Sequence, residues 1–119
     1  MNLRGLTLIS TAALLTAILG GCAPAGPSAS PVTTSAVDLP ASYRFAPPGI
    51  SVAPGTTVTW TNNDHFTHSV QFLDGGLPTD PLLMDPGATT TFTFDATGVF
   101  QYQCHLHPQN MRGSVTVTR

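Results

Sequence analysis

Residues 98–111 read Gly98-Val99-Phe100-Gln101-Tyr102-Gln103-Cys104-His105-Leu106-His107-Pro108-Gln109-Asn110-Met111. The first half of this stretch alternates apolar and polar residues, which is the period of a β-strand with one buried face. The second half brings a thiol, two imidazoles and a thioether close together in the chain. Thiolate and thioether are soft ligands suited to copper, and imidazole also binds copper. The stretch therefore predicts a strand that runs directly into a set of metal donors.

The donors that fit one metal best are Cys104, His107 and Met111, with a second histidine from elsewhere in the chain. Two histidines, one cysteine and a weak axial methionine form the donor set of a blue-copper electron-transfer site. Zinc is less suitable, because methionine is a poor zinc ligand. Taken singly, Cys104 and Met111 could be ordinary core residues. The combination favours a metal site.

Strand parity selects among the histidines. His68 shares a face with Val70 and Phe72, which should be the core face, whereas His65 has the opposite parity. His105 has the opposite parity from Cys104, and we expect it to face outward as a surface histidine. His68 is therefore the expected second imidazole.

The same alternation recurs along the chain after residue 42, and turn signals such as Pro54-Gly55 and Asp85-Pro86-Gly87 separate the runs. Short strands at this spacing predict an all-β fold, an antiparallel sandwich or barrel. Residues 73–86 are expected to form a loop with at most one short turn or strand near Leu82-Leu83. The alternating apolar positions are Tyr43, Phe45, Ile50, Val52, Val58, Trp60, Val70, Phe72, Phe92, Phe94, Phe100, Tyr102, Val115 and Val117.

The N-terminal part has the composition of an export signal followed by a linker. Residues 1–21 combine Arg4 with an apolar run from Leu6 to Leu19, which predicts a secretory signal peptide and is short for a transmembrane helix. The run ends in Leu19-Gly20-Gly21-Cys22, which resembles a bacterial lipobox and implies lipidation of Cys22. Residues 22–38 are rich in Ala, Pro, Ser and Thr and predict a disordered tether. The folded domain is expected over residues 39–119.

Charge and cysteine content limit the function classes. The chain has four basic and six acidic side chains and a formal net charge of −2, with no basic cluster, so nucleic acid is an unsuitable partner. With so few charges, a protein partner is expected to dock on an apolar patch. If Cys22 carries lipid, Cys104 has no disulfide partner, and a free thiol in an exported protein is simplest to explain by metal binding.

The chain resembles the small cupredoxins of the plastocyanin/azurin-like family, which includes plastocyanin, amicyanin and pseudoazurin. The resemblance rests on residues 58–64 (VTWTNND) leading into His68-Ser69-Val70, on residues 98–104, and on His107-Pro108 followed by Met111. It implies a Greek-key β-sandwich and one copper ion held by His68, Cys104, His107 and Met111.

Two positions depart from the family pattern. The gap between His107 and Met111 lies between those of amicyanin and plastocyanin. Ser69 stands where many relatives have an asparagine that ties two ligand loops together. The resemblance also implies that the edge of the His107 ring, beside Leu106 and Pro108, is the port through which electrons pass.

The expected function is therefore one-electron transfer by a type 1 copper centre, without substrate turnover, in a monomer anchored by lipid on the extracytoplasmic side of a bacterial membrane. The expected partners are redox proteins that bind transiently. Two alternatives remain from the sequence: a protein that stores or delivers copper, and a non-redox binding domain. A multicopper oxidase is disfavoured, since its trinuclear cluster needs more imidazoles than four histidines supply.

Overall fold

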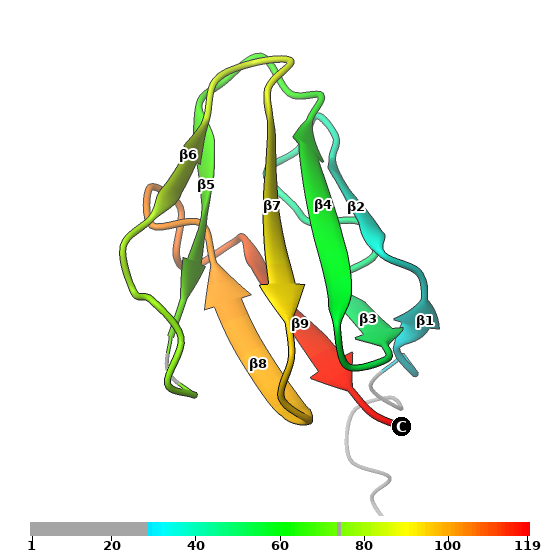
Figure 1. Ribbon diagram of the computed structural model, residues 1–119. Helices are drawn as coiled ribbons and strands as arrows, with labels where there is room; N and C mark the ends of the chain where they lie inside the picture. Colours follow the sequence, from blue (N-terminus) through cyan, green and yellow to red (C-terminus); the bar gives the residue numbers. More distant parts are fainter. Residues whose placement is uncertain (1–28, 74) are drawn as a thin grey trace, which may run out of the picture.

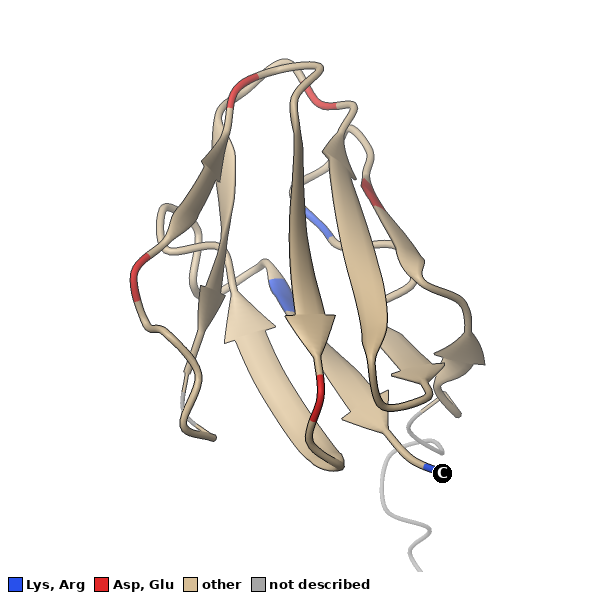
Figure 2. Ribbon diagram, viewed as in Figure 1, with Lys and Arg blue, Asp and Glu red and all other residues tan. Residues whose placement is uncertain are grey.

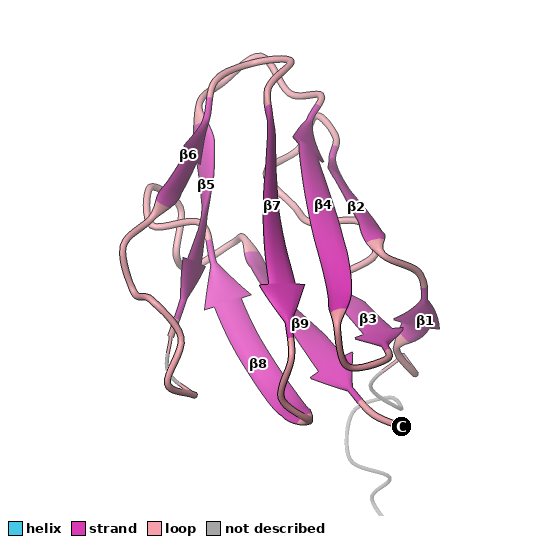
Figure 3. Ribbon diagram, viewed as in Figure 1, coloured by secondary structure: helices cyan, strands magenta, loops and turns pink. Residues whose placement is uncertain are grey.

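The computed structural model describes residues 29–73 and 75–119, which form a β-sandwich of two facing sheets (Figure 1). No helix occurs in this part of the chain, and the all-β prediction is confirmed (Figure 3). Nine strands build the two sheets. They are β1 Val32–Thr33, β2 Ala36–Leu39, β3 Gly49–Val52, β4 Thr56–Asn62, β5 His68–Phe72, β6 Leu82–Met84, β7 Thr89–Phe94, β8 Gly98–Gln103 and β9 Arg112–Val117.

The larger sheet has the strand order β1-β3-β9-β8-β5-β6, and the smaller one has the order β2-β4-β7. Strands β8 and β9 pair antiparallel, as do β5 with β8, β5 with β6, and β4 with β7. Three other pairs are parallel: β1 with β3, β2 with β4, and β3 with β9. The sheets are therefore mixed, which differs from the expected antiparallel pairing. Alternation reveals which face of a strand is buried but not the direction of its neighbour.

The period-two pattern places the large aromatic residues between the sheets. Trp60, Phe72 and Tyr102 are almost completely buried, and the rings of Trp60 and Tyr102 lie 5.4 Å apart at their centroids. Burial raises the pKa of Tyr102 to about 12, because the interior disfavours the phenolate. The Tyr102 side chain is therefore neutral at ordinary pH. It lies in the core on β8, the strand that leads directly to Cys104.

The fold begins earlier than the sequence predicted. The expected tether over residues 22–38 contains β1 and most of β2, and Val37 and Leu39 in β2 are buried. The sequence offered little indication of β1, because this strand is only two residues long and both residues are exposed. Residues 22–28, like the predicted signal peptide over 1–21, lie outside the described residues.

Residues 40–45 form a loop instead of the expected strand through Tyr43 and Phe45. Ser42 and Tyr43 have left-handed backbone angles, with φ of 106° and 54°. Such angles reverse the chain and interrupt strand geometry. Phe45 is nevertheless buried, 2% exposed, and the loop turns Tyr43 toward the histidines described below.

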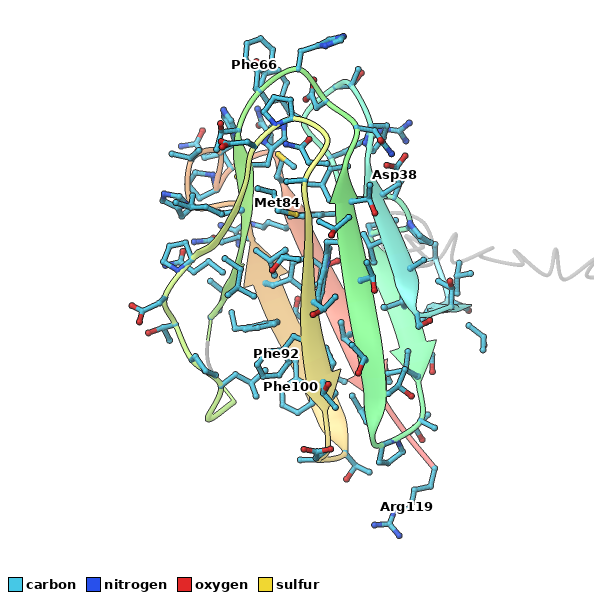
Figure 4. All side chains as sticks on the ribbon, turned by 45° about the horizontal axis from the view of Figure 1, so that its top comes forward. Asp38, Phe66, Met84, Phe92, Phe100 and Arg119 are labelled. Atoms are coloured by element: carbon cyan, nitrogen blue, oxygen red, sulfur yellow. The ribbon has the colours of Figure 1, made fainter. Side chains whose placement is uncertain are left out.

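Charged residues are few and lie scattered along the described strands and loops (Figure 2). No helix in the described part is long and apolar enough to span a membrane. Phe66 and Arg119 mark opposite ends of the sandwich, with Met84, Phe92 and Phe100 between them (Figure 4).

Candidate metal centre

The donor-rich loop is a tight connection between two paired strands. Cys104 follows the end of β8 directly and Met111 precedes β9, and the Cys104 N–H donates to the Met111 carbonyl at 3.1 Å. Inside the loop, the N–H groups of His107 and Met111 donate to the carbonyls of Cys104 and His107, at 3.1 and 3.0 Å. The backbone thus folds back on itself and presents its donors on one side.

His68 reaches these donors from the first position of β5. The Cys104 sulfur lies 3.8 Å from Nδ1 of His68 and 3.7 Å from Nδ1 of His107. One donor atom from each of the three residues lies within 4.8 Å of the others. His68 and Cys104 are fully buried, whereas His107 is half-buried. The structure therefore brings together three of the four residues that the sequence singled out.

Met111 is the fourth residue, and its side chain is fully buried. It is held in the loop by the two backbone hydrogen bonds that link it to Cys104 and His107. The role of its thioether as axial ligand remains a prediction. His65 is exposed and lies outside the group of converging donors found among the described residues.

The far side of the His68 ring contacts a carboxylate that the sequence reasoning missed. Nε2 of His68 lies 2.9 Å from Oδ2 of Asp64, and both side chains are buried. The hydrogen bond with His68 is the largest effect on the pKa of Asp64 and lowers it, partly offset by burial, which raises it; the backbone N–H of His65 lowers it further. Asp64 is four residues before His68, in a connection without regular period, so no alternation pattern marked it.

Ser69 connects β5 to the donor-rich loop. Its hydroxyl oxygen accepts the backbone N–H of His105 at 3.0 Å and lies 2.7 Å from Nδ1 of the same residue. It also lies 3.8 Å from the Cys104 sulfur. His105 is therefore half-buried and engaged rather than fully turned to solvent as expected. The short serine side chain and this imidazole together bridge the two segments.

Aromatic rings line the outer side of the centre. The Tyr43 ring meets the His107 ring edge to face at 4.7 Å and stacks on Phe66 at 5.6 Å. Phe66 is 54% exposed and Leu106 is 48% exposed. Tyr43 thus packs against His107, the only one of the three converging donors that is not fully buried, and the exposed apolar residue Leu106 precedes it in the chain.

Comparison with known proteins agrees with this geometry. Residues 33–118 match the family described as copper binding proteins, plastocyanin/azurin family. The chain is 31% identical over 83 residues to a plastocyanin from Scenedesmus fuscus, with 61% of this chain and 85% of that protein covered. It is 36% identical over 84 residues to amicyanin from Paracoccus denitrificans, with 68% of this chain and 63% of that protein covered. The match thus spans less than two thirds of the amicyanin.

Solved structures give the same result. A purple cupredoxin from Nitrosopumilus maritimus is 30% identical, with a TM-score of 0.61, and the match covers 70% of this chain and 98% of that one. A reduced variant of amicyanin is 34% identical, with a TM-score of 0.63, and the match covers 70% of this chain and 80% of that one. The fold and the converging donors define a copper-binding β-sandwich. The chain belongs to the plastocyanin/azurin family of copper-binding proteins.

The donor chemistry of this structure fits copper. One thiol and two imidazole nitrogens converge in a largely buried position, and these are ligands that copper prefers. Each imidazole presents Nδ1 toward the sulfur, so the two rings offer equivalent atoms. His68, Cys104 and His107 could hold the ion, with Met111 available from the same loop.

Proposed function

We propose that this protein is a type 1 copper protein that carries single electrons outside the cytoplasm. The observation that carries the proposal is the convergence of the Cys104 sulfur with Nδ1 of His68 and Nδ1 of His107 within 4.8 Å. Bound copper would supply a one-electron couple between Cu(I) and Cu(II). We assign His68, Cys104, His107 and Met111 as its ligands.

The surrounding protein suits a site that must change little when its charge changes. Cys104 and His68 belong to neighbouring, paired strands of one sheet, and the loop from Cys104 to Met111 is fixed by backbone hydrogen bonds. Burial of the sulfur keeps water and oxidants away from the thiolate. Because the protein itself holds the donors in place, little reorganisation opposes the arrival or departure of an electron.

We assign the edge of the His107 ring as the electron port, with Leu106 and Pro108 beside it. His107 and Pro108 are half-buried and Leu106 is exposed, so a partner could approach the ring without penetrating the core. Interfaces of transient electron-transfer complexes are small, which suits such a patch. No substrate is transformed in this scheme, and the protein acts as a monomeric carrier rather than as an enzyme.

We also propose that export and lipidation of Cys22 hold the domain at the extracytoplasmic side of a bacterial membrane. The support is the sequence of residues 1–22, with its apolar run and lipobox-like end. Because β1 starts at Val32, the linker between the anchor and the fold would be shorter than residues 22–38. Cys22→Ser should release the protein from the membrane fraction of the expressing cell without changing its spectrum.

The absorption spectrum of the purified protein tests the function. With Cu(II), we expect an intense blue or purple band from charge transfer between the thiolate and the metal, lost on reduction and absent in Cys104→Ser. A colourless protein that binds only Cu(I) would instead indicate copper storage or delivery. Failure to bind copper at all would indicate a binding domain without a metal function.

A further inference from the structure

Asp64 is an unusual residue for its position. Among the described residues it is the only acidic side chain that is buried, with 5% exposure. Burying a carboxylate costs free energy unless its charge is hydrogen-bonded, so Asp64 requires a hydrogen-bond partner in the interior. That partner is the imidazole of His68.

The hydrogen bonds around Asp64 hold the carboxylate in one orientation. Its Oδ1 accepts the N–H of His65 at 2.7 Å, and Oδ2 faces Nε2 of His68 at 2.9 Å. The N–H of Asp64 donates to Oδ1 of Asn62 at 3.0 Å. The two carboxylate oxygens therefore make different contacts: Oδ1 with the backbone and Oδ2 with the His68 ring.

Asn62 in turn is anchored to two other segments. Its Nδ2 donates to the carbonyl of Phe66 at 2.8 Å and to the carbonyl of Met84 at 3.0 Å. Asn62 is fully buried at the end of β4. The sheet, the β4–β5 connection and β6 thus jointly fix the position from which Asp64 meets His68.

The two candidate imidazole ligands are consequently unequal. A carboxylate faces Nε2 of the His68 ring, whereas the only hydrogen-bond contact of the His107 ring in the described residues is that of its Nδ1 with the Cys104 sulfur. An ionised carboxylate can only accept a hydrogen bond, so it favours the tautomer with the proton on Nε2 and leaves Nδ1 as the lone-pair nitrogen. It also makes a ligating imidazole more basic.

We propose that Asp64 is a positioning residue that fixes His68 with its proton on Nε2 and strengthens it as a ligand for the oxidised metal, which lowers the reduction potential of the centre. This inference rests on the proposed copper function. A more basic imidazole, with a negative charge behind it, stabilises Cu(II) more than Cu(I). Asp64 thereby sets the driving force of the carrier without touching the metal.

The reduction potential of copper-loaded Asp64→Asn tests the proposal. Asparagine can still accept the Nε2 proton but carries no charge. We expect at least a tenfold fall in the ratio of Cu(II) to Cu(I) affinity, which for a one-electron couple raises the potential by about 59 mV. Asp64→Glu, which keeps the charge, should stay closer to the wild type.

Asp85→Asn is the matched control. Asp85 is exposed and accepts a hydrogen bond from Thr67, the residue beside His68, at 2.9 Å, without contacting the ring. The Asp85→Asn substitution also removes one negative charge near His68. A potential that moves equally in Asp64→Asn and Asp85→Asn overturns the proposal.

Nuclear magnetic resonance of the wild-type protein with Cu(I) tests the tautomer without any substitution. We expect a proton on Nε2 of His68 that is shifted downfield and exchanges more slowly than that of His107. Equal shifts and exchange rates at the two rings would overturn the proposal even if the Asp64 variants do not fold. A wild type that binds copper without colour would refute the proposed function. A coloured wild type whose potential is insensitive to Asp64→Asn would refute only the present inference.

Discussion

The hydroxyl oxygen of Ser69 lies 2.7 Å from Nδ1 of His105 and accepts the N–H of that residue at 3.0 Å. One side chain of β5 is thereby joined twice to the residue that follows Cys104. The bridge ties the strand that carries His68 to the loop that carries the other donors.

Ser69→Ala should destabilise the copper-free protein. The substitution removes both contacts and leaves a partly buried N–H without a partner, which costs about 1–3 kcal/mol. The measurement is urea unfolding of the copper-free protein. Thr57→Ala is the control, since it removes an exposed hydroxyl pair with Thr93 and should change stability by about 0.5 kcal/mol or less. Equal effects of the two substitutions would show that the Ser69 bridge adds nothing.

Met111→Leu should keep the copper and raise the reduction potential. Leucine fills a similar volume, so the loss of stability should stay below about 1.5 kcal/mol. It cannot donate to Cu(II), and the axial ligand tunes the potential of blue-copper sites. Redox titration measures the effect. Met84→Leu is the control: it changes another fully buried methionine and should leave the reduction potential unchanged. If Met111→Leu also leaves it in place, Met111 is not the axial ligand.

Tyr102 should make the protein lose stability in strong alkali. Its pKa is raised to about 12 in the folded protein, against an ordinary value of 10.0. The unfolded chain therefore releases this proton first as the pH rises, and stability present below pH 10 is lost between about pH 10 and 12. A difference of two pKa units corresponds to about 3 kcal/mol. Urea unfolding across this range should show the loss in the wild type and in Tyr43→Phe. The same loss in Tyr102→Phe would contradict this origin.

Leu106→Asp should slow electron self-exchange between two copies of the protein. A charge on each copy beside His107 would repel the other copy in the encounter, and we expect a decrease of about tenfold or more at low salt. Line broadening in mixtures of oxidised and reduced protein gives the rate. Val99→Asp introduces the same charge at another exposed apolar residue, at the start of β8, and should have little effect. Comparable rates for Leu106→Asp and the wild type would remove Leu106 from the electron port.

The sequence predicted the sandwich because each long strand buries one face. Val58 and Trp60 in β4 and Tyr102 in β8 follow the period-two pattern, and their burial is as expected. The same parity placed His68 and Cys104 inward and so brought two distant donors to one point. Local alternation contains this information because it depends only on which face meets the core.

Other features depend on distant neighbours and left no local pattern. The parallel pairing of β3 with β9 joins segments from opposite ends of the fold, and no alternation reveals its direction. Strand β1 is too short and too exposed to produce a recognisable alternation pattern. Asp64 contacts His68 within the irregular connection before β5. Ser69 in β5 contacts His105, which follows the neighbouring strand β8. Neither contact can be predicted from spacing along the chain.

The place of β9 has a consequence for incomplete chains. It is the last strand in the sequence, yet it lies between β3 and β8 in the middle of the larger sheet. A chain cut in the loop before Arg112 would leave β3 and β8 each with a row of unpaired backbone groups. Such open edges are templates for pairing with other chains, so proteolysis of the donor-rich loop should yield an aggregating product instead of a smaller soluble domain.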